Sequence, residues 1–136
     1  MNVKILIDTN VLLDAFTERD NFSTSAKELL RNVSMDKYDT YISSKTVLDF
    51  YYLYHHYSHS KEIALNCLKM IVDMFQIIEV NSDDLRFALE SEVNDYEDAV
   101  LIEGAKRYDI DLIITRNQHH YKDSPIKSIS PNEFLN

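Results

Sequence analysis

The sequence predicts an α/β protein with a central parallel sheet flanked by helices, and two observations lead to this fold class. Short apolar runs alternate with longer stretches whose apolar residues recur at helical spacing, which is the pattern of successive βα units. The chain has one glycine and lacks the Asn-Gly or Asp-Gly pairs that two-residue hairpins usually require, so an antiparallel meander is disfavoured. Its 136 residues fit a single domain over residues 1–136.

The first predicted strand covers residues 3–7, an aliphatic and largely β-branched run that suits a strand buried on both faces. Asp8 ends this run. The next two residues, Thr9 and Asn10, are good helix caps, so we expect a helix to begin near Asn10. Asp8 is therefore expected at the carboxyl end of a central strand, where open α/β sheets place their ligands.

The rest of the chain alternates between helices that begin at hydroxyl or acidic residues and short apolar strands. A polar break at residues 19–21 precedes a helix that Ser23 or Thr24 is expected to cap. Apolar stripes at three- and four-residue spacing support the longer helices. The predicted elements are helices over residues 23–33, 43–57, 60–75, 82–93 and 96–108, strands over residues 40–43, 76–80, 112–115 and 126–129, and a helical turn over residues 117–121.

The composition indicates a globular protein with an acidic surface. The formal net charge is −9, whereas proteins that bind nucleic acid by broad phosphate neutralisation are normally basic. Any nucleic-acid contact must therefore use a local patch, bound cations or a partner. Cys67 is the only cysteine, which excludes an intrachain disulfide and fits a reducing cytoplasm. The chain shows no signal peptide and no apolar run of membrane length, so no membrane association is expected.

Polar side chains follow the predicted strands or begin the next helix at four places. These residues are Asp8, Asp49, the pair Asp95 and Asp98, and the run Thr115, Arg116 and Asn117. In a doubly wound sheet such positions can converge on one cleft. Each also has an ordinary structural interpretation, as a helix cap or as a solvated side chain. Their combination in the expected order favours a functional site.

Several carboxylates in one cleft require a counter-charge. Two carboxylates about 5 Å apart repel by roughly 3 kcal/mol at an effective dielectric constant near 20. Oxygen ligands without a thiolate favour Mg²⁺ or Mn²⁺. Such a cation can activate water and stabilise charge on a phosphoryl oxygen, as in many nucleases. We do not expect His119 or His120 to bind it, because hard cations prefer oxygen.

Five segments in this order resemble PIN-domain proteins of the kind found as the toxin of bacterial VapBC toxin–antitoxin pairs. They are Ile7-Asp8-Thr9-Asn10-Val11, residues 42–49, Asp95-Tyr96-Glu97-Asp98-Ala99, Ile113-Ile114-Thr115-Arg116-Asn117 and Ser130-Pro131-Asn132-Glu133-Phe134-Leu135. The resemblance covers nearly the whole chain. It implies a Rossmann-like sheet, Mg²⁺- or Mn²⁺-dependent hydrolysis of RNA phosphodiester bonds, a cognate antitoxin that blocks the cleft, and a homodimer.

The resemblance also implies roles for individual residues. Asp8 and Asp98 match metal-binding acids of the family, and Asp95 matches an additional acid of one branch. Asp49 stands where the family usually has glutamate; its side chain is one methylene shorter, so it is expected to reach the metal through water. The four residues expected to hold the metal and carry catalysis are Asp8, Asp49, Asp95 and Asp98. Asn117 stands where many members have aspartate, which puts a second metal in doubt. At the rim of the cleft, the residues expected to contact substrate or a ligand are Asn10, Thr115, Arg116 and Asn117.

Two alternatives remain open at this point. A PIN fold that has lost catalysis would act as a binding module, and the departures at Asp49 and Asn117 support it. Another metal-dependent phosphohydrolase is the second alternative. The Asp8-Thr9-Asn10 stretch lacks a second aspartate two residues after the first, so a phospho-aspartate mechanism of that common pattern fits poorly.

Overall fold

Five parallel strands form the central sheet of the protein. The computed structural model describes residues 2–18 and 22–136. Within this part of the chain the strand order is β3-β2-β1-β4-β5, and each neighbouring pair is parallel. The strands are β1 (Lys4–Ile7), β2 (Asp39–Ser43), β3 (Gln76–Ile78), β4 (Leu112–Ile114) and β5 (Lys127–Ile129). The predicted fold class is confirmed, and β5 is the expected edge strand.

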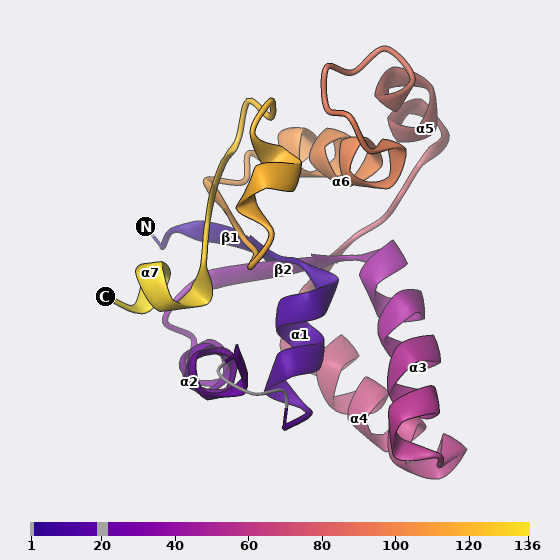
Figure 1. The fold of residues 1–136 in the computed structure, drawn as a ribbon, viewed down its shortest axis with the longest axis vertical. Coiled ribbons are helices and arrows are strands. Elements are labelled where there is room, and N and C mark those ends of the chain that lie inside the picture. Colours follow the sequence, from indigo (N-terminus) through magenta and orange to yellow (C-terminus); the bar gives the residue numbers. More distant parts are fainter. Residues whose placement is uncertain (1, 19–21) are drawn as a thin grey trace.

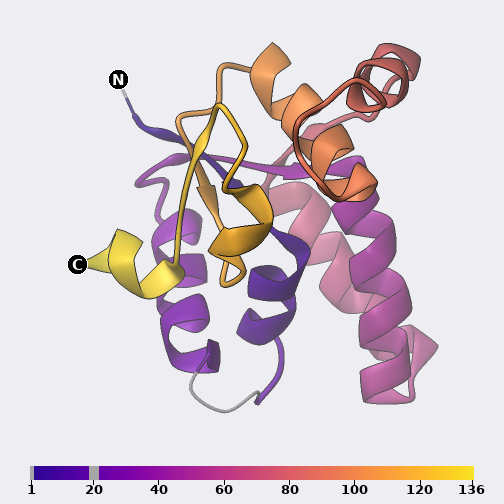
Figure 2. The same cartoon turned by 45° about the horizontal axis from the view of Figure 1, so that its top comes forward.

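Helices cover both faces of the sheet (Figures 1 and 2). They are α1 (Thr9–Ala15), α2 (Phe22–Ser34), α3 (Ser44–Ser58), α4 (Lys61–Met74), α5 (Ser82–Ala88), α6 (Tyr96–Arg107) and α7 (Pro131–Leu135), with a 3-10 turn η1 (Gln118–Tyr121). Helices α1 to α4 contribute to one apolar core, and α5 and α6 contribute to a second core on the opposite face. The chain therefore forms a three-layer sandwich with the sheet in the middle.

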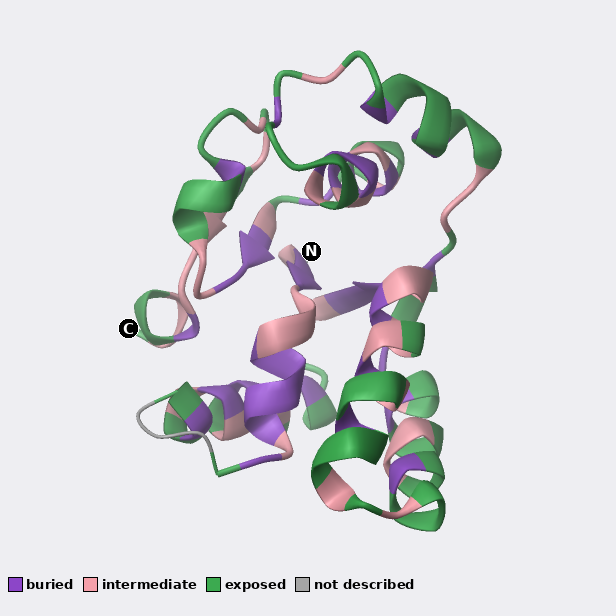
Figure 3. Ribbon diagram, turned by 45° about the vertical axis from the view of Figure 1, so that its right-hand side comes forward, coloured by how far each residue is buried: buried purple, intermediate pink, exposed green. Residues whose placement is uncertain are grey.

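Successive side chains of β1 point to opposite faces of the sheet, and an apolar core covers each face. This explains why the sequence of a central strand is a continuous apolar run. Ile5 and Ile7 pack into the core beneath α1 to α4, while Leu6 packs into the core beneath α6. All three side chains are buried, and Figure 3 shows the central strands almost entirely in the buried colour. Because both faces are covered along residues 5–7, this part of the strand is apolar on both sides, and the carboxylate of Asp8 follows directly at its carboxyl end.

Side-chain caps define where several helices begin. Ser43 accepts a hydrogen bond from the backbone of Lys45 and starts α3. Ser60 caps α4, as predicted. A capping box between Ser130 and Glu133 starts α7, a helix that the sequence analysis missed although its cap and its proline at the first turn are both visible in the sequence.

Two predicted helix starts are wrong in detail. Asp8, and not Thr9 or Asn10, caps α1, because its carboxylate accepts from the backbone N–H of Thr9. Helix α2 already begins at Phe22, so Ser23 and Thr24 lie inside its first turn. The polar break predicted at residues 19–21 lies outside the described residues.

Helix α5 is shorter than expected, and its cap is Asn81 in place of Ser82. It ends at Ala88, whereas the prediction extended to about residue 93. Leu89 is 74% exposed, and Val93 is the one buried residue between 89 and 95. Without a continuous apolar face, the polar residues of this stretch favour turns over a further helical turn. Across the described residues, none of the helices has the length and apolar character that a membrane crossing requires.

Candidate active site

Asp8 occupies the carboxyl end of β1, where two neighbouring elements hold its carboxylate in place. Oδ1 accepts from the backbone N–H of Thr9 at 2.9 Å, and Oδ2 accepts from Thr115 Oγ1 at 2.9 Å. Burial raises the pKa of the Asp8 carboxyl, and the hydrogen bonds from Thr115 and Thr9 offset part of this effect. The side chain therefore has a fixed orientation and an environment that disfavours an uncompensated negative charge.

Asp98 stands in the first turn of α6 and faces Asp8. Its pKa is raised to about 6, first by burial and then by the charges of Asp95 and Asp8. The Tyr121 hydroxyl donates to Asp98 Oδ1 at 3.3 Å, and His120 Nδ1 lies 3.6 Å from Oδ2. A shift of this kind marks carboxylates that are packed together more closely than their charges favour.

Asp95 is the N-cap of α6, with Oδ1 accepting from the backbone N–H of Asp98 at 3.0 Å. It does not line the cleft. Asp95 is therefore a helix cap, as its ordinary structural interpretation expects. Its charge also raises the pKa of Asp98.

Asp49 lies on α3, on the other side of the cleft, in contact with a cation supplied by the chain. Lys45 Nζ donates to Asp49 Oδ2 at 2.6 Å and lies 3.4 Å from Glu97 Oε2 on α6. Burial lowers the pKa of Lys45, but the hydrogen bond and charge of Asp49, together with Glu97, raise it more. The Thr9 and Thr46 hydroxyls share a hydrogen bond of 2.9 Å, which links α1 to α3 at the same place.

The cleft itself has a volume of about 70 Å³. Three of the four predicted carboxylates, Asp8, Asp49 and Asp98, line it, together with Lys45 and Glu97. The sequence analysis missed these last two, although the four-residue spacing from Lys45 to Asp49 is a recognised helix pairing and Glu97 adjoins Asp98. It also missed the contact from Tyr121, because a hydroxyl in a 3-10 turn carries no sequence signal for a long-range contact.

The predicted rim residues separate into two groups. Thr115 is fully buried, donates to Asp8 and accepts from the backbone N–H of Asn117 at 3.0 Å. Asn10 and Asn117 are not among the residues that line the cleft. Arg116 points elsewhere: its Nε lies 3.2 Å from Asp14 Oδ2, and its guanidinium lies 4.3 Å from the centre of the Phe22 ring. Arg116 thus lies outside the residues that line the cleft, and its expected contact with substrate stays a prediction.

The donor set of the cleft fits a hard divalent cation. Asp8 and Asp98 offer carboxylate oxygens; burial raises the pKa of both carboxyls, and the charges of Asp95 and Asp8 raise that of Asp98 further. In the described part of the chain, no three His, Cys, Asp or Glu side chains form a ready-made metal site. Asp49 is instead paired with Lys45 at 2.6 Å. Asp8 and Asp98 would thus hold the ion, with water completing its shell, as is usual for Mg²⁺.

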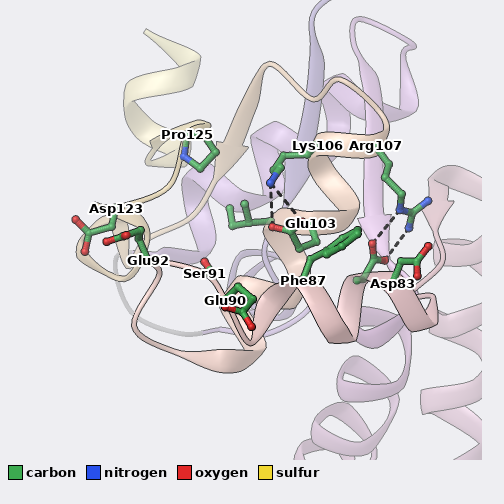
Figure 4. A pocket seen from close by; sticks show the side chains of 12 residues that line it. Asp83, Phe87, Glu90, Ser91, Glu92, Glu103, Lys106, Arg107, Asp123 and Pro125 are labelled. Carbon is green, nitrogen blue, oxygen red and sulfur yellow. Dashed lines mark hydrogen bonds and ion pairs between the residues drawn. The ribbon is translucent and has the colours of Figure 1, made fainter.

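A second, larger cavity of about 700 Å³ lies beside α5 and α6. Figure 4 shows two ion pairs at this cavity, which join Lys106 to Glu103 and Arg107 to Asp84. None of the predicted site residues lines it. Size alone therefore does not select the candidate site, and the raised pKa values of Asp8 and Asp98 favour the smaller cleft.

A parallel sheet with carboxylates gathered at its carboxyl edge defines a class of α/β proteins suited to cation-assisted phosphoryl chemistry. The chain belongs to the PIN domain family, whose sequence profile matches residues 4–119. It is similar to Ribonuclease VapC1 of Aquifex aeolicus (strain VF5), with 26% identity over 136 residues that span 96% of this chain and 92% of that protein.

Solved structures share the fold at lower sequence identity. A toxin–antitoxin complex from Klebsiella pneumoniae aligns with a TM-score of 0.68 and 24% identity, covering 93% of this chain and 97% of that chain. FitAcB from Neisseria gonorrhoeae aligns with a TM-score of 0.73 and 18% identity, covering 93% and 97%. These likenesses support the same arrangement of sheet and helices.

Proposed function

We propose that the protein is a divalent-metal-dependent endoribonuclease and the toxin of a toxin–antitoxin pair. The observation that carries this proposal is the Asp8–Asp98 pair at the carboxyl edge of the sheet. Within residues 2–18 and 22–136, no lysine or arginine pairs with either carboxylate. The similarity to Ribonuclease VapC1 over 96% of the chain supports RNA as the substrate.

The residues of the cleft have distinct tasks in this proposal. Mg²⁺ or Mn²⁺, when bound, would supply an activated water and stabilise charge on a phosphoryl oxygen. Asp8 and Asp98 hold the ion, and Thr115 keeps the Asp8 carboxylate aimed at it through the 2.9 Å hydrogen bond. Tyr121 does the same for Asp98. Asp95 adds negative charge behind Asp98, which favours a cation at this position.

The expected partner of this chain is inferred from the solved structures to which it is similar. The solved neighbours include toxin–antitoxin complexes from Klebsiella pneumoniae and Rickettsia felis, so we assign a cognate antitoxin as the protein partner of this chain. A homodimer is the assembly that the family resemblance implies. We propose that this activity is cytoplasmic; the single cysteine, which cannot form an intrachain disulfide, fits a reducing compartment.

The direct test is cleavage of a labelled RNA panel by the purified chain with Mg²⁺ or Mn²⁺, and again with EDTA. Asp8→Asn should lower the cleavage rate by about a hundredfold or more, since even an outer-shell partner of a metal is worth roughly ten- to a hundredfold. Asp83→Asn is the matched control, because Asp83 is an exposed acid of α5 outside the cleft. Equal rates for Asp8→Asn and the parent protein would refute the proposed role of Asp8.

A PIN-fold binding module without catalysis is the second candidate, and one observation favours it. Asp49 is already bonded to Lys45 at 2.6 Å, which removes one oxygen ligand from the metal-free cleft. Calorimetric titration separates the two functions. An enzyme takes up Mn²⁺ at the Asp8–Asp98 pair, and Asp8→Asn abolishes the uptake. A binding module shows no Mn²⁺ uptake that depends on Asp8.

A further inference from the structure

One basic side chain, Lys45, lines the described part of the cleft, and it contacts acids on two different helices. Among the described residues that line the cleft, Lys45 is the one lysine or arginine. A pair at four-residue spacing normally connects two residues of one helix. Lys45 does this with Asp49 of α3, but it also lies 3.4 Å from Glu97 of α6. Its ammonium is therefore held over the cleft between two helices.

We propose that Lys45 is the residue that contacts the RNA phosphate in this cleft. The inference rests on the ribonuclease function proposed above. An ammonium has three donors, and Asp49 and Glu97 face it from two directions. The side chain of Lys45 is 36% exposed, so a donor remains accessible from solvent. The two carboxylates fix the direction of the lysine and leave this donor for an incoming phosphate oxygen.

The charge distribution of the protein explains why such a residue is needed. The chain carries a formal net charge of −9, so the approach of a polyanion is unfavourable except where positive charge is local. Arg116 does not supply that charge, because it is bonded to Asp14 away from the cleft. Lys45 stands beside Asp8 and Asp98 in the same 70 Å³ cleft, where it would neutralise a phosphate next to the reacting one.

The test compares Lys45→Met with Lys106→Met. Lys106 pairs with Glu103 on α6 at 3.0 Å, at the cavity shown in Figure 4 and away from the cleft. Both substitutions remove one positive charge and one helix ion pair. Binding of a fluorescent single-stranded RNA is measured in the cleavage-deficient Asp8→Asn background, over a range of salt concentrations. Circular dichroism checks the fold, and Lys45→Gln replaces the methionine variant if that variant does not fold.

Lys45→Met should weaken RNA binding about tenfold or more, the factor for one charge-assisted hydrogen bond. It should also reduce the slope of log affinity against log salt by about 0.7, the value for one phosphate contact on a single strand. Lys45→Arg should restore most of the affinity because it keeps the charge. Lys106→Met should bind as the background protein does. In the active chain, Lys45→Met should raise KM more than it lowers kcat.

Two results would overturn the assignment while leaving the ribonuclease function in place. The first is RNA binding and a salt slope for Lys45→Met that equal those of Lys106→Met. The second, measured by titration of the chain that retains Asp8, is a loss of Mn²⁺ affinity in Lys45→Met by the same factor as the loss of RNA affinity, which would mean that the lysine acts through the metal site. If the parent chain neither binds nor cleaves RNA, the proposed function itself fails, and this outcome is recognised before any lysine is replaced.

Discussion

A partly or fully buried aspartate lies at each end of helix α6. The aspartate at one end is paired with an arginine, and the aspartate at the other end is not. At its C-terminal end, Arg107 donates from Nε and Nη2 to the buried Asp84 at 2.9 and 2.8 Å. Burial alone would raise the pKa of Asp84, but the Arg107 hydrogen bonds lower it. At its N-terminal end, Asp98 faces Asp95 and Asp8 and has a pKa raised to about 6.

The difference teaches how to distinguish a structural acid from a functional one in this fold. Asp84 of α5 is paired with Arg107 of α6, so its charge is neutralised within the protein and the pair joins the two helices. Among the described residues, the one potential cation that contacts Asp98 is His120, 3.6 Å away. The protein thus leaves a negative charge uncompensated at the carboxyl edge of the sheet, where a cation can bind.

The largest effect is expected from breaking the compensated pair. Arg107→Met leaves the Asp84 charge buried without a partner and should lower the free energy of unfolding by about 3 kcal/mol. Urea denaturation measures this loss, and Lys106→Met, a neighbouring exposed lysine, is the control. If the two variants lose the same free energy, the Arg107–Asp84 pair is not special. Metal-stimulated cleavage per folded molecule should be unchanged in both.

At the N-terminal end of α6, where Asp98 lacks a counter-charge, a substitution is expected to raise the free energy of unfolding. The pKa of Asp98 is raised from 3.8 to about 6 by burial and by the charges of Asp95 and Asp8, so removing its charge with Asp98→Asn should stabilise the protein in EDTA at neutral pH by about 2 to 3 kcal/mol, at 1.36 kcal/mol per pKa unit. Saturating Mn²⁺ should reduce or reverse this difference in stability between the variant and the parent protein, since the parent binds the ion more tightly. Four melting curves provide the measurement. If neither protein responds to metal and both melt together in EDTA, the carboxylates do not form one site.

The smallest effect expected is a pH dependence of the metal-free protein. The folded-state pKa of Asp98 is raised from 3.8 to about 6, so the folded state binds the proton more tightly than the unfolded state. Stability from this group is therefore present below pH 3.8 and is lost as pH rises through 6. Denaturation in EDTA should show the parent gaining stability relative to Asp98→Asn between pH 7 and pH 5, by about 1 to 2 kcal/mol. A constant difference over this range would argue against the assigned pKa.

Local patterns in the sequence were sufficient for much of the fold. The β-branched run of β1, the serine caps of α3 and α4 and the apolar stripes of the long helices predicted elements that the structure contains. These signals work because hydrophobic periodicity and capping act within a few residues of one another. Where such signals were ambiguous, as after Ala88, the predicted helix was too long.

The site depends on contacts between residues far apart in the chain. The sequence predicted that Asp8 and Asp98 would meet, because strand ends of a parallel sheet share an edge. It could not show that Lys45 would hold Asp49 and reach Glu97, or that Arg116 would turn to Asp14. The choice among nearby partners for a charged side chain depends on distances and burial, and these exist only once α3 and α6 are packed on the sheet.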